Sequence, residues 1–363
     1  MKNLKALLSL LIAVFFLSGC AASTKLPRFV WPPPPEKPRV EWKGVYFTEA
    51  DYSRNEGGDF FNKFLGDTEG DRFKTPIGIA ADSKNRVYIS DVHQKNVWVY
   101  DFANKKVGFI SSLSPFASPL GVAIDGQDNV YVADGEKGKV FVFSSAGEPL
   151  NTIDGSGLME KPAYLEINEQ LGRLYVSDAK LHKVLAFDLS GNHLFSFGEK
   201  GSEEGQFFAP QGMAFSPEGD LFVVDMLNAR VQVFSADGKF KYLFGTRGDK
   251  AGQFESPKDI AFDSDGNAYV VEGRRSNVEI YSSDGQLLLV LGDGRVTRSV
   301  FGFAAPRAIH IDKTDRIYVS NALGRSFSVW NYFGLKYQAE NPFTDEDKRV
   351  LLEYMKHVQE EKK

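Results

Sequence analysis

The sequence of 363 residues predicts an all-β fold, a six-bladed β-propeller, and three observations carry that prediction. Six prolines recur at intervals of 43 to 49 residues: Pro76, Pro119, Pro162, Pro210, Pro257 and Pro306. Each proline begins an apolar run that alternates at period two, as strands do, and not at the 3.6-residue period of a helical repeat. Each repeat holds four such runs separated by short turns, which is the content of one propeller blade.

The second strand of each repeat ends on an acidic or amide residue. The six ends are Asp91, Asp134, Asp178, Asp225, Glu272 and Asn321. A ring spreads equivalent positions around its axis, so their recurrence predicts a structural role and not one reaction centre. A short side chain at a strand end can accept the backbone N–H groups of the next turn. In three blades it can also pair, at a partly exposed rim, with the basic residue five positions on: Lys139, Lys183 or Arg230.

The order proline, Gly-Ile/Val-Ala, turn, Tyr-Val-x-Asp, loop, Arg/Lys-Val-x-Val-Phe resembles the NHL repeat, whose domains are six-bladed β-propellers. The resemblance covers about residues 70 to 333, and the third and sixth repeats depart from it with PAYLEIN and PRAIHID. Propellers commonly fasten the first blade to the last. We expect RVEWKGVYF (39–47) to be the closing strand of the sixth blade, with GLKYQ (334–338) as the alternative, and DFFNKFLGD (59–67) to be a packed turn or helical piece.

The chain begins with a secretory signal. Lys2 and Lys5 precede an apolar run over residues 6–17, which is too short to span a membrane comfortably. The run ends in Leu-Ser-Gly-Cys, which resembles the lipobox of bacterial lipoproteins. That resemblance implies cleavage before Cys20, the only cysteine, and lipid on its thiol. Ala21 then implies the outer membrane of the cell envelope, on a face that the sequence does not determine.

These marks divide the chain into four segments: signal peptide 1–19, lipidated cysteine and Pro-rich tether 20–38, propeller 39–340, and C-terminal amphipathic helix 341–363. The six prolines of the tether favour an extended chain of about 3.1 Å per residue, a spacer of up to roughly 50 Å. Thr344 and Asp347 resemble a capping box, and a helical apolar stripe follows at Leu351, Tyr354, Met355 and Val358. We expect this helix to dock on the propeller, with partner binding as the alternative.

The loops after the six acidic or amide residues concentrate basic side chains, although the net charge of the chain is −5. Besides one acid, Glu136, they contain Lys95, Lys137, Lys139, Lys180, Lys183, Arg230, Arg274, Arg275 and Arg325. The residue after the blade proline reaches the same rim and is polar in blades four to six: Gln211, Lys258 and Arg307. The pattern predicts a surface for an anionic partner. The alternative is that about half of these basic residues only balance the charge of the acids at the strand ends.

The rival prediction is an enzyme, because amidating lyases that resemble NHL propellers hold zinc through histidines. A zinc site needs three or four converging ligands, and the five histidines occupy non-equivalent positions. Glu166 and His310 each fall four residues after a blade proline, where the other blades have alanine. With Tyr164 and Asp259 they could frame a site in the channel, or pack between blades.

Function is therefore predicted as a non-catalytic, membrane-anchored binding scaffold, with a metal-dependent lyase or hydrolase as the alternative. No catalytic motif of proper spacing occurs, and no cofactor beyond the lipid is expected. An acidic protein or an envelope polysaccharide is the expected partner, and nucleic acid is not expected beyond the inner membrane. Resemblance to bacterial propeller lipoproteins suggests exported multihaem cytochromes as one partner class.

Overall fold

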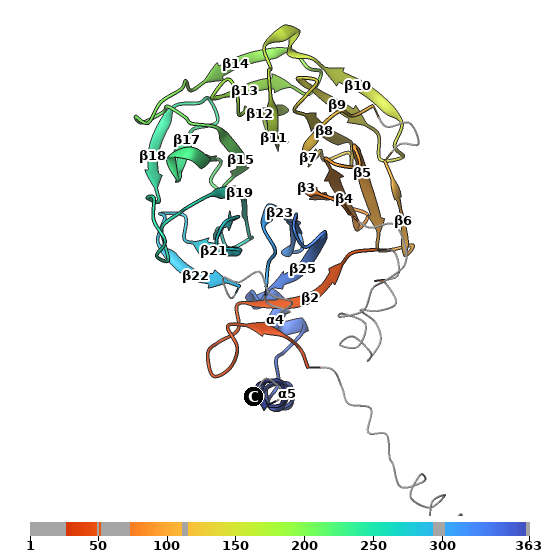
Figure 1. Cartoon of the computed structure of the whole chain (residues 1–363), viewed down its shortest axis with the longest axis vertical. Coiled ribbons are helices and arrows are strands. Elements are labelled where there is room, and N and C mark those ends of the chain that lie inside the picture. Colours follow the sequence, from red (N-terminus) through yellow and green to blue (C-terminus); the bar gives the residue numbers. More distant parts are fainter. Residues whose placement is uncertain (1–26, 49–50, 52–72, 111–114, 293–301, 361–363) are drawn as a thin grey trace, which may run out of the picture.

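The computed structural model describes residues 27–48, 51, 73–110, 115–292 and 302–360, and it shows a six-bladed β-propeller (Figure 1). The predicted fold is confirmed. The signal peptide, Cys20 and residues 59–67 lie outside the described residues.

Each blade is an antiparallel sheet whose first strand lines the central channel. From the channel outward, the first blade contains β3 (Pro76–Ala81), β4 (Arg86–Asp91), β5 (Asn96–Asp101) and β6 (Lys106–Phe109), and the second contains β7 (Pro119–Ile124), β8 (Val130–Asp134), β9 (Lys139–Phe143) and β10 (Pro149–Ile153). The third contains β11 (Pro162–Asn168), β12 (Arg173–Asp178), β13 (Lys183–Asp188) and β14 (His193–Phe197), and the fourth contains β15 (Pro210–Phe215), β16 (Leu221–Asp225), β17 (Arg230–Phe234) and β18 (Phe240–Phe244). The fifth contains β19 (Pro257–Phe262), β20 (Ala268–Glu272), β21 (Asn277–Tyr281) and β22 (Leu287–Leu291), and the sixth contains β23 (Pro306–Ile311), β24 (Arg316–Asn321), β25 (Ser326–Tyr332), β2 (Val40–Tyr46) and β1 (Val30–Trp31).

Close approach of the inner strands depends on small residues two positions after the blade proline. A Cβ atom on Gly78 would lie 2.2 Å from the carbonyl oxygen of Leu120, and one on Gly121 would lie 2.7 Å from the Cα of Tyr164. Real side chains never approach backbone this closely, so these positions need glycine where neighbouring inner strands touch. The apolar side chains of adjacent blades then form the buried clusters between blades.

The sixth blade is completed by the N-terminal part of the chain, as predicted. β2 pairs antiparallel with β25, placing Val40 opposite Tyr332 and Tyr46 opposite Phe327. The rings of Tyr46 and Phe327 stack with centroids 5.1 Å apart. The alternative closing segment, residues 334–338, is wrong, because those residues belong to helix α4 (Leu335–Glu340).

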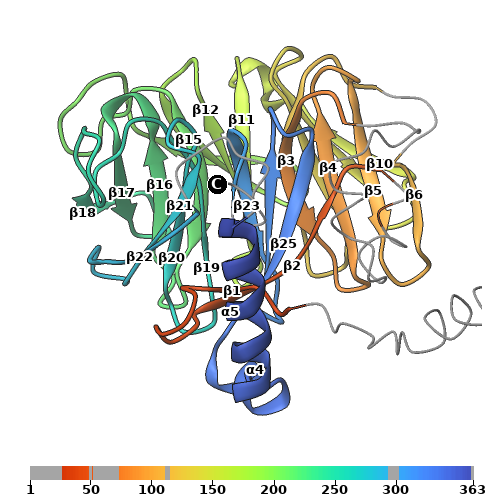
Figure 2. The ribbon, with the colours of Figure 1, turned by 60° about the horizontal axis from the view of Figure 1, so that its bottom comes forward.

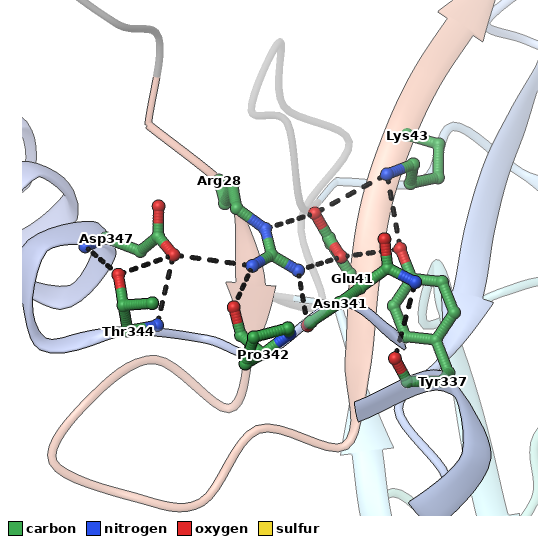
Figure 3. Close-up of polar contacts among 8 residues, drawn as sticks. All are labelled: Arg28, Glu41, Lys43, Tyr337, Asn341, Pro342, Thr344 and Asp347. Atoms are coloured by element: carbon green, nitrogen blue, oxygen red, sulfur yellow. Dashed lines mark hydrogen bonds and ion pairs between the residues drawn. The ribbon is translucent and has the colours of Figure 1, made fainter. Parts of the chain in front are cut away.

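Within residues 27–38, the predicted extended spacer is wrong for residues 28–31, which fold against the fifth and sixth blades. β1 pairs with β2, and the indole N–H of Trp31 donates to the carbonyl oxygen of Val290 at 2.8 Å. The Arg28 guanidinium makes a bidentate contact with Glu41, with N–O distances of 2.9 and 2.8 Å (Figure 3). It also donates to the carbonyl oxygen of Pro342 at 2.7 Å. The side chains of Phe29 and Val30 are buried beside Leu351, so apolar burial and these polar contacts hold the segment where proline content alone favoured extension.

The C-terminal helix α5 (Asp345–Glu360) docks on the same edge of the ring (Figure 2). Its predicted capping box is present, because the backbone N–H of Asp347 donates to Thr344 Oγ1 at 3.1 Å and that of Thr344 to Asp347 Oδ2 at 3.0 Å. Leu351 is fully buried in a cluster with Phe29 and Val30. Docking is therefore confirmed for this part of the stripe. Within the described ranges, no helix has the length and apolarity that crossing a membrane requires.

Candidate functional site

The alternating course of the strands gives the ring two distinct faces. We call the face with the loops between second and third strands the loop face; inner strands also begin there. We call the opposite face, with the turns between first and second strands, the turn face. The central channel runs between them, so each face has its own channel mouth.

The six acidic or amide residues are buried fasteners of the loop face. The Asp134 carboxylate accepts hydrogen bonds from the backbone N–H groups of Ala117 and Ser118, which lead into the blade, and from those of Glu136 and Lys137 in its own loop. Asp91 and Asp178 bind in the same way. The predicted structural role fits this geometry. The predicted partly exposed rim is wrong, because these side chains are 0 to 3% exposed.

The fasteners give the six loops one backbone frame. The residue four positions after each fastener has a positive φ of 50 to 63° in every blade: Lys95, Gly138, His182, Ala229, Ser276 and Arg325. Of the three ion pairs predicted between an acid and the residue five positions on, only Asp225 with Arg230 forms within the described part of the chain, at 2.9 Å. The shared frame presents different side chains in each blade.

Two of the predicted rim arginines serve the fold. The Arg230 guanidinium donates to the carbonyl oxygens of Ser202, Glu203 and Gln206, at 2.7 to 2.9 Å. In the next blade, Arg275 donates to the carbonyl oxygens of Lys250 and Gln253. Both hold the long segment that leads into a blade, so neither guanidinium is available to a partner.

Other rim cations lie on the loop face with local partners. Lys180 pairs with Glu160 at 2.6 Å, and Arg274 pairs with Glu255 at 2.8 Å. Lys137 donates to the carbonyl oxygen of Pro115 and lies 5.6 Å from the Phe141 ring centroid. Three other predicted cations of this face, Lys95, Lys183 and Arg325, have exposed side chains, and Lys139 is half-buried.

Lys258 and Arg307 differ from these cations because they begin neighbouring inner strands at the channel mouth. No carboxylate of the described chain forms an ion pair with either side chain, and the Nε atom of Arg307 is buried without a hydrogen-bond partner. Gly273 leaves room for Lys258, since a Cβ there would lie 2.9 Å from its Cε. Burial, and then the charge of Arg307, lower the pKa of Lys258 to about 8. Gln211 lies buried in the adjacent blade.

The four predicted channel residues come together around one cavity of about 700 Å³. Tyr164 crosses the channel from the third blade and donates to the carbonyl oxygen of Arg307, in the sixth, at 2.8 Å. Asp259 accepts from the backbone N–H groups of Ile260 and Ile309, both at 2.9 Å. Glu166 accepts from the N–H of Phe215 at 3.1 Å. These side chains form hydrogen bonds between blades, and they also line the cavity.

The predicted metal alternative finds no ligand cluster in the part of the chain that the structure describes. No three His, Cys, Asp or Glu side chains there are close enough to hold a metal ion. His310 lines the cavity, where burial lowers its pKa.

The sequence reasoning missed a second set of fasteners, on the turn face. Acids that end four inner strands accept a hydrogen bond from a second-strand tyrosine in the same blade at 2.9 to 3.3 Å: Asp82 from Tyr88, Asp125 from Tyr131, Asp263 from Tyr269 and Asp312 from Tyr318. The third and fourth blades have Asn168 and Ser216 instead. The signal was available, because Asp and Tyr recur six residues apart in four repeats.

Fold and channel together define a six-bladed β-propeller with a continuous central channel lining. Residues 116–143, which form most of the second blade, match the NHL repeat, so the predicted resemblance is confirmed. No curated protein matches the sequence.

Solved structures share the fold at low sequence identity. A gluconolactonase from Xanthomonas campestris is 16% identical with a TM-score of 0.57, over 85% of this chain and 99% of that one. Virginiamycin B lyase from Staphylococcus aureus, solved with quinupristin, is 11% identical with a TM-score of 0.55, over 73% and 82%. An auxiliary nutrient binding protein from Bacteroides thetaiotaomicron is 14% identical with a TM-score of 0.57, over 72% and 70%. Because enzymes and a binding protein share the fold, the fold does not choose between those functions.

Proposed function

We propose that this chain is a non-catalytic binding scaffold that captures an acidic protein at the channel mouth of its loop face. We also propose that lipid on Cys20 holds it at the outer membrane of a bacterial cell envelope. An anionic envelope polysaccharide is the competing partner, and exported multihaem cytochromes are one class of protein to test.

One observation carries the proposal: Lys258 and Arg307 lie on neighbouring inner strands, and neither has a carboxylate partner within the described chain. Their neighbours Arg230 and Arg275 are occupied by carbonyl groups, and Lys180 and Arg274 by glutamates. Two half-buried cations without an anion cost free energy, which a carboxylate from a partner would recover. An anion there would also raise the lowered pKa of Lys258 again.

The test measures binding of poly-L-glutamate to the purified protein over a range of salt concentrations. We expect Lys258→Gln with Arg307→Gln to weaken binding at least tenfold and to reduce its salt dependence. The matched control is Lys180→Gln with Arg274→Gln, which removes the same charge from the same face and should change affinity less than twofold.

Equal losses in both variants would show that general surface charge attracts the probe, and an unchanged affinity in the first variant would refute the proposal. Tighter capture of polygalacturonate than of polyglutamate would favour the polysaccharide partner. One tightly bound zinc or calcium ion per purified chain would favour the metal-dependent enzyme instead. Cross-linking in cells followed by mass spectrometry would then identify the neighbour.

Membrane attachment is tested independently of the partner. Cys20→Ser should move the protein from the membrane fraction to the soluble fraction, because the lipid on the thiol would be lost. Persistence in the membrane fraction, or an N-terminal peptide without an acyl mass in the wild type, would contradict the anchor.

A further inference from the structure

A cavity lies in the channel and extends to the turn face. Its lining includes Ser83, Asp128 and Lys313, which belong to turns of the turn face, and it includes neither Lys258 nor Arg307. The bond from Tyr164 to the Arg307 carbonyl oxygen crosses the channel between the two mouths. The two cations of the proposed partner surface therefore do not line the cavity, and its volume of about 700 Å³ is that of a small-molecule site.

Two carboxyl groups lie deep in this cavity without a cation. Glu166 uses one oxygen to accept from Phe215 N–H, and its second oxygen makes no hydrogen bond within the described chain. Asp259 is 6% exposed and accepts only backbone N–H groups. Room for Asp259 is provided by Gly212, because a Cβ there would lie 1.8 Å from Asp259 Oδ1. Neither carboxyl forms an ion pair with a lysine or arginine of the described residues.

Burial disfavours the charged forms of the inner titratable groups of this cavity, and acidic residues predominate in its outer lining. Burial raises the pKa of Glu166 to about 8 and raises that of Asp259 well above its ordinary value, and the charge of Glu166 adds to the second shift. Burial also lowers the pKa of His310, so this imidazole is neutral at pH 7 and does not repel a cation. Carboxylates outnumber basic groups in the outer lining: Asp82, Asp125, Asp128, Glu169 and Asp312 against Lys313 and Arg316.

The remaining wall is apolar. Ile79, Val122, Leu165, Phe215 and Ile260 line it, beside the small side chains of the inner strands. A ligand that matches this wall carries a hydrocarbon body, while a ligand that matches Glu166 and Asp259 carries a positive charge or a hydrogen-bond donor.

We propose that this cavity binds an organic cation, with its ammonium group between Glu166 and Asp259 and its hydrocarbon body against the apolar wall. This goes beyond capture of an acidic protein, since it concerns the opposite face and the opposite charge. The ammonium group favours the ionised form of Glu166, and the ion pair forms once this carboxyl has lost its proton. Because that carboxyl is mostly protonated at pH 7, binding releases close to one proton.

Calorimetry on the purified full chain tests this proposal with a matched pair of probes, 2-phenylethylammonium and 2-phenylethanol. We expect the ammonium compound to bind at least tenfold more tightly, and its heat in buffers of different ionisation enthalpy to report proton release at pH 7. Glu166→Gln should weaken ammonium binding at least tenfold and remove the proton release that comes from this carboxyl. Glu218→Gln, which removes an acid of the turn face outside the cavity, is the control and should change neither quantity.

A second measurement uses the unsubstituted protein, so it does not depend on whether a variant folds. The side-chain carboxyl ¹³C signal of Glu166 should titrate near pH 8 in the free protein and at lower pH with the ammonium probe. Equal binding of the alcohol without proton release would show a site for neutral ligands and overturn the proposal, as would unchanged binding in Glu166→Gln. The double variant Lys258→Gln with Arg307→Gln should bind the ammonium probe normally, so failure of the loop-face proposal leaves this one intact.

Discussion

The two mouths of the channel have the same ring of strands around them and opposite chemistry. On the loop face, Lys258 and Arg307 bring two cations that form no ion pair within the described chain. On the turn face, Glu166 and Asp259 bring two carboxyls without a cation. All four residues occupy the first five positions of an inner strand, where most other blades have small or apolar residues. In this propeller, the fasteners stabilise the same backbone frame in every blade. The first residues of the inner strands in blades three, five and six give the two channel mouths their different charges.

The largest expected effect comes from removing a fastener, which should damage both mouths together. Asp134→Ala leaves four backbone N–H groups without their acceptor in a fully buried position. We expect a loss of about 3 kcal/mol or more in the free energy of unfolding, measured by urea denaturation. Asp134→Asn keeps one acceptor oxygen, as Asn321 does in the sixth blade, and should lose less. Equal losses in the two variants would mean that the carboxylate acceptor is not what stabilises the loop.

The second prediction separates the mouths by their response to pH. The raised pKa of Glu166 means that the folded state holds a proton which the unfolded state has lost, so this group's contribution to stability falls as pH rises from about 4.5 to 8. The lowered pKa of Lys258 means that the folded state loses its proton first, so stability rises between about pH 8 and 10.5. Each slope is at most about 1.4 kcal/mol per pH unit.

Denaturation curves over this pH range check both signs. Glu166→Gln should make the fall in the free energy of unfolding below pH 8 less steep and leave the rise above pH 8 unchanged. Lys258→Met should leave the fall unchanged and make the rise less steep. Loss of both slopes in either variant would show that the mouths are coupled through the channel.

The smallest expected effect concerns the Tyr164 side chain, which crosses the channel between the two mouths. Tyr164→Phe removes the hydroxyl that donates to the Arg307 carbonyl oxygen and keeps the ring that packs in the core. The expected loss is about 1 kcal/mol in the free energy of unfolding, the ordinary net value of one hydrogen bond. Binding of the ammonium probe should hardly change, because the ring still separates the mouths. Tyr164→Ala removes the ring as well, and interference between ammonium and polyglutamate binding would then show that the mouths communicate.

The fold could be predicted from the sequence because the same pattern of four strands occurs in six repeats. Spacing of the prolines, alternation at period two and the recurrent strand-end acid all survive in the structure, as does the closing strand. Burial of the fasteners was not predictable from one repeat, since half of the donors to Asp134 come from residues 16 and 17 positions earlier, in the segment that leads into the blade. Likewise, the count of basic residues could not show that Arg230 and Arg275 bind such segments.

In the channel, too, the sequence predicted individual residues but not the contacts among them. Glu166 and His310 were recognisable because they replace alanine at one repeat position. Their grouping with Tyr164 and Asp259 depends on ring closure, which brings the third blade opposite the sixth. Docking of residues 28–31 was missed because prolines favour extension, whereas Phe29, Val30 and Trp31 between them supply the burial that overrides it.

That docking has a consequence for how the protein meets its partners. The Arg28 clamp leaves only residues 21–27 between the proposed lipid and the folded body, a contour of at most about 25 Å. With lipid on Cys20, the ring is attached at the edge of its sixth blade and stays close to the bilayer. Encounters would then occur by lateral diffusion in a thin layer, so a partner that is itself confined to the same membrane meets this protein far more often than one dispersed in the surrounding volume.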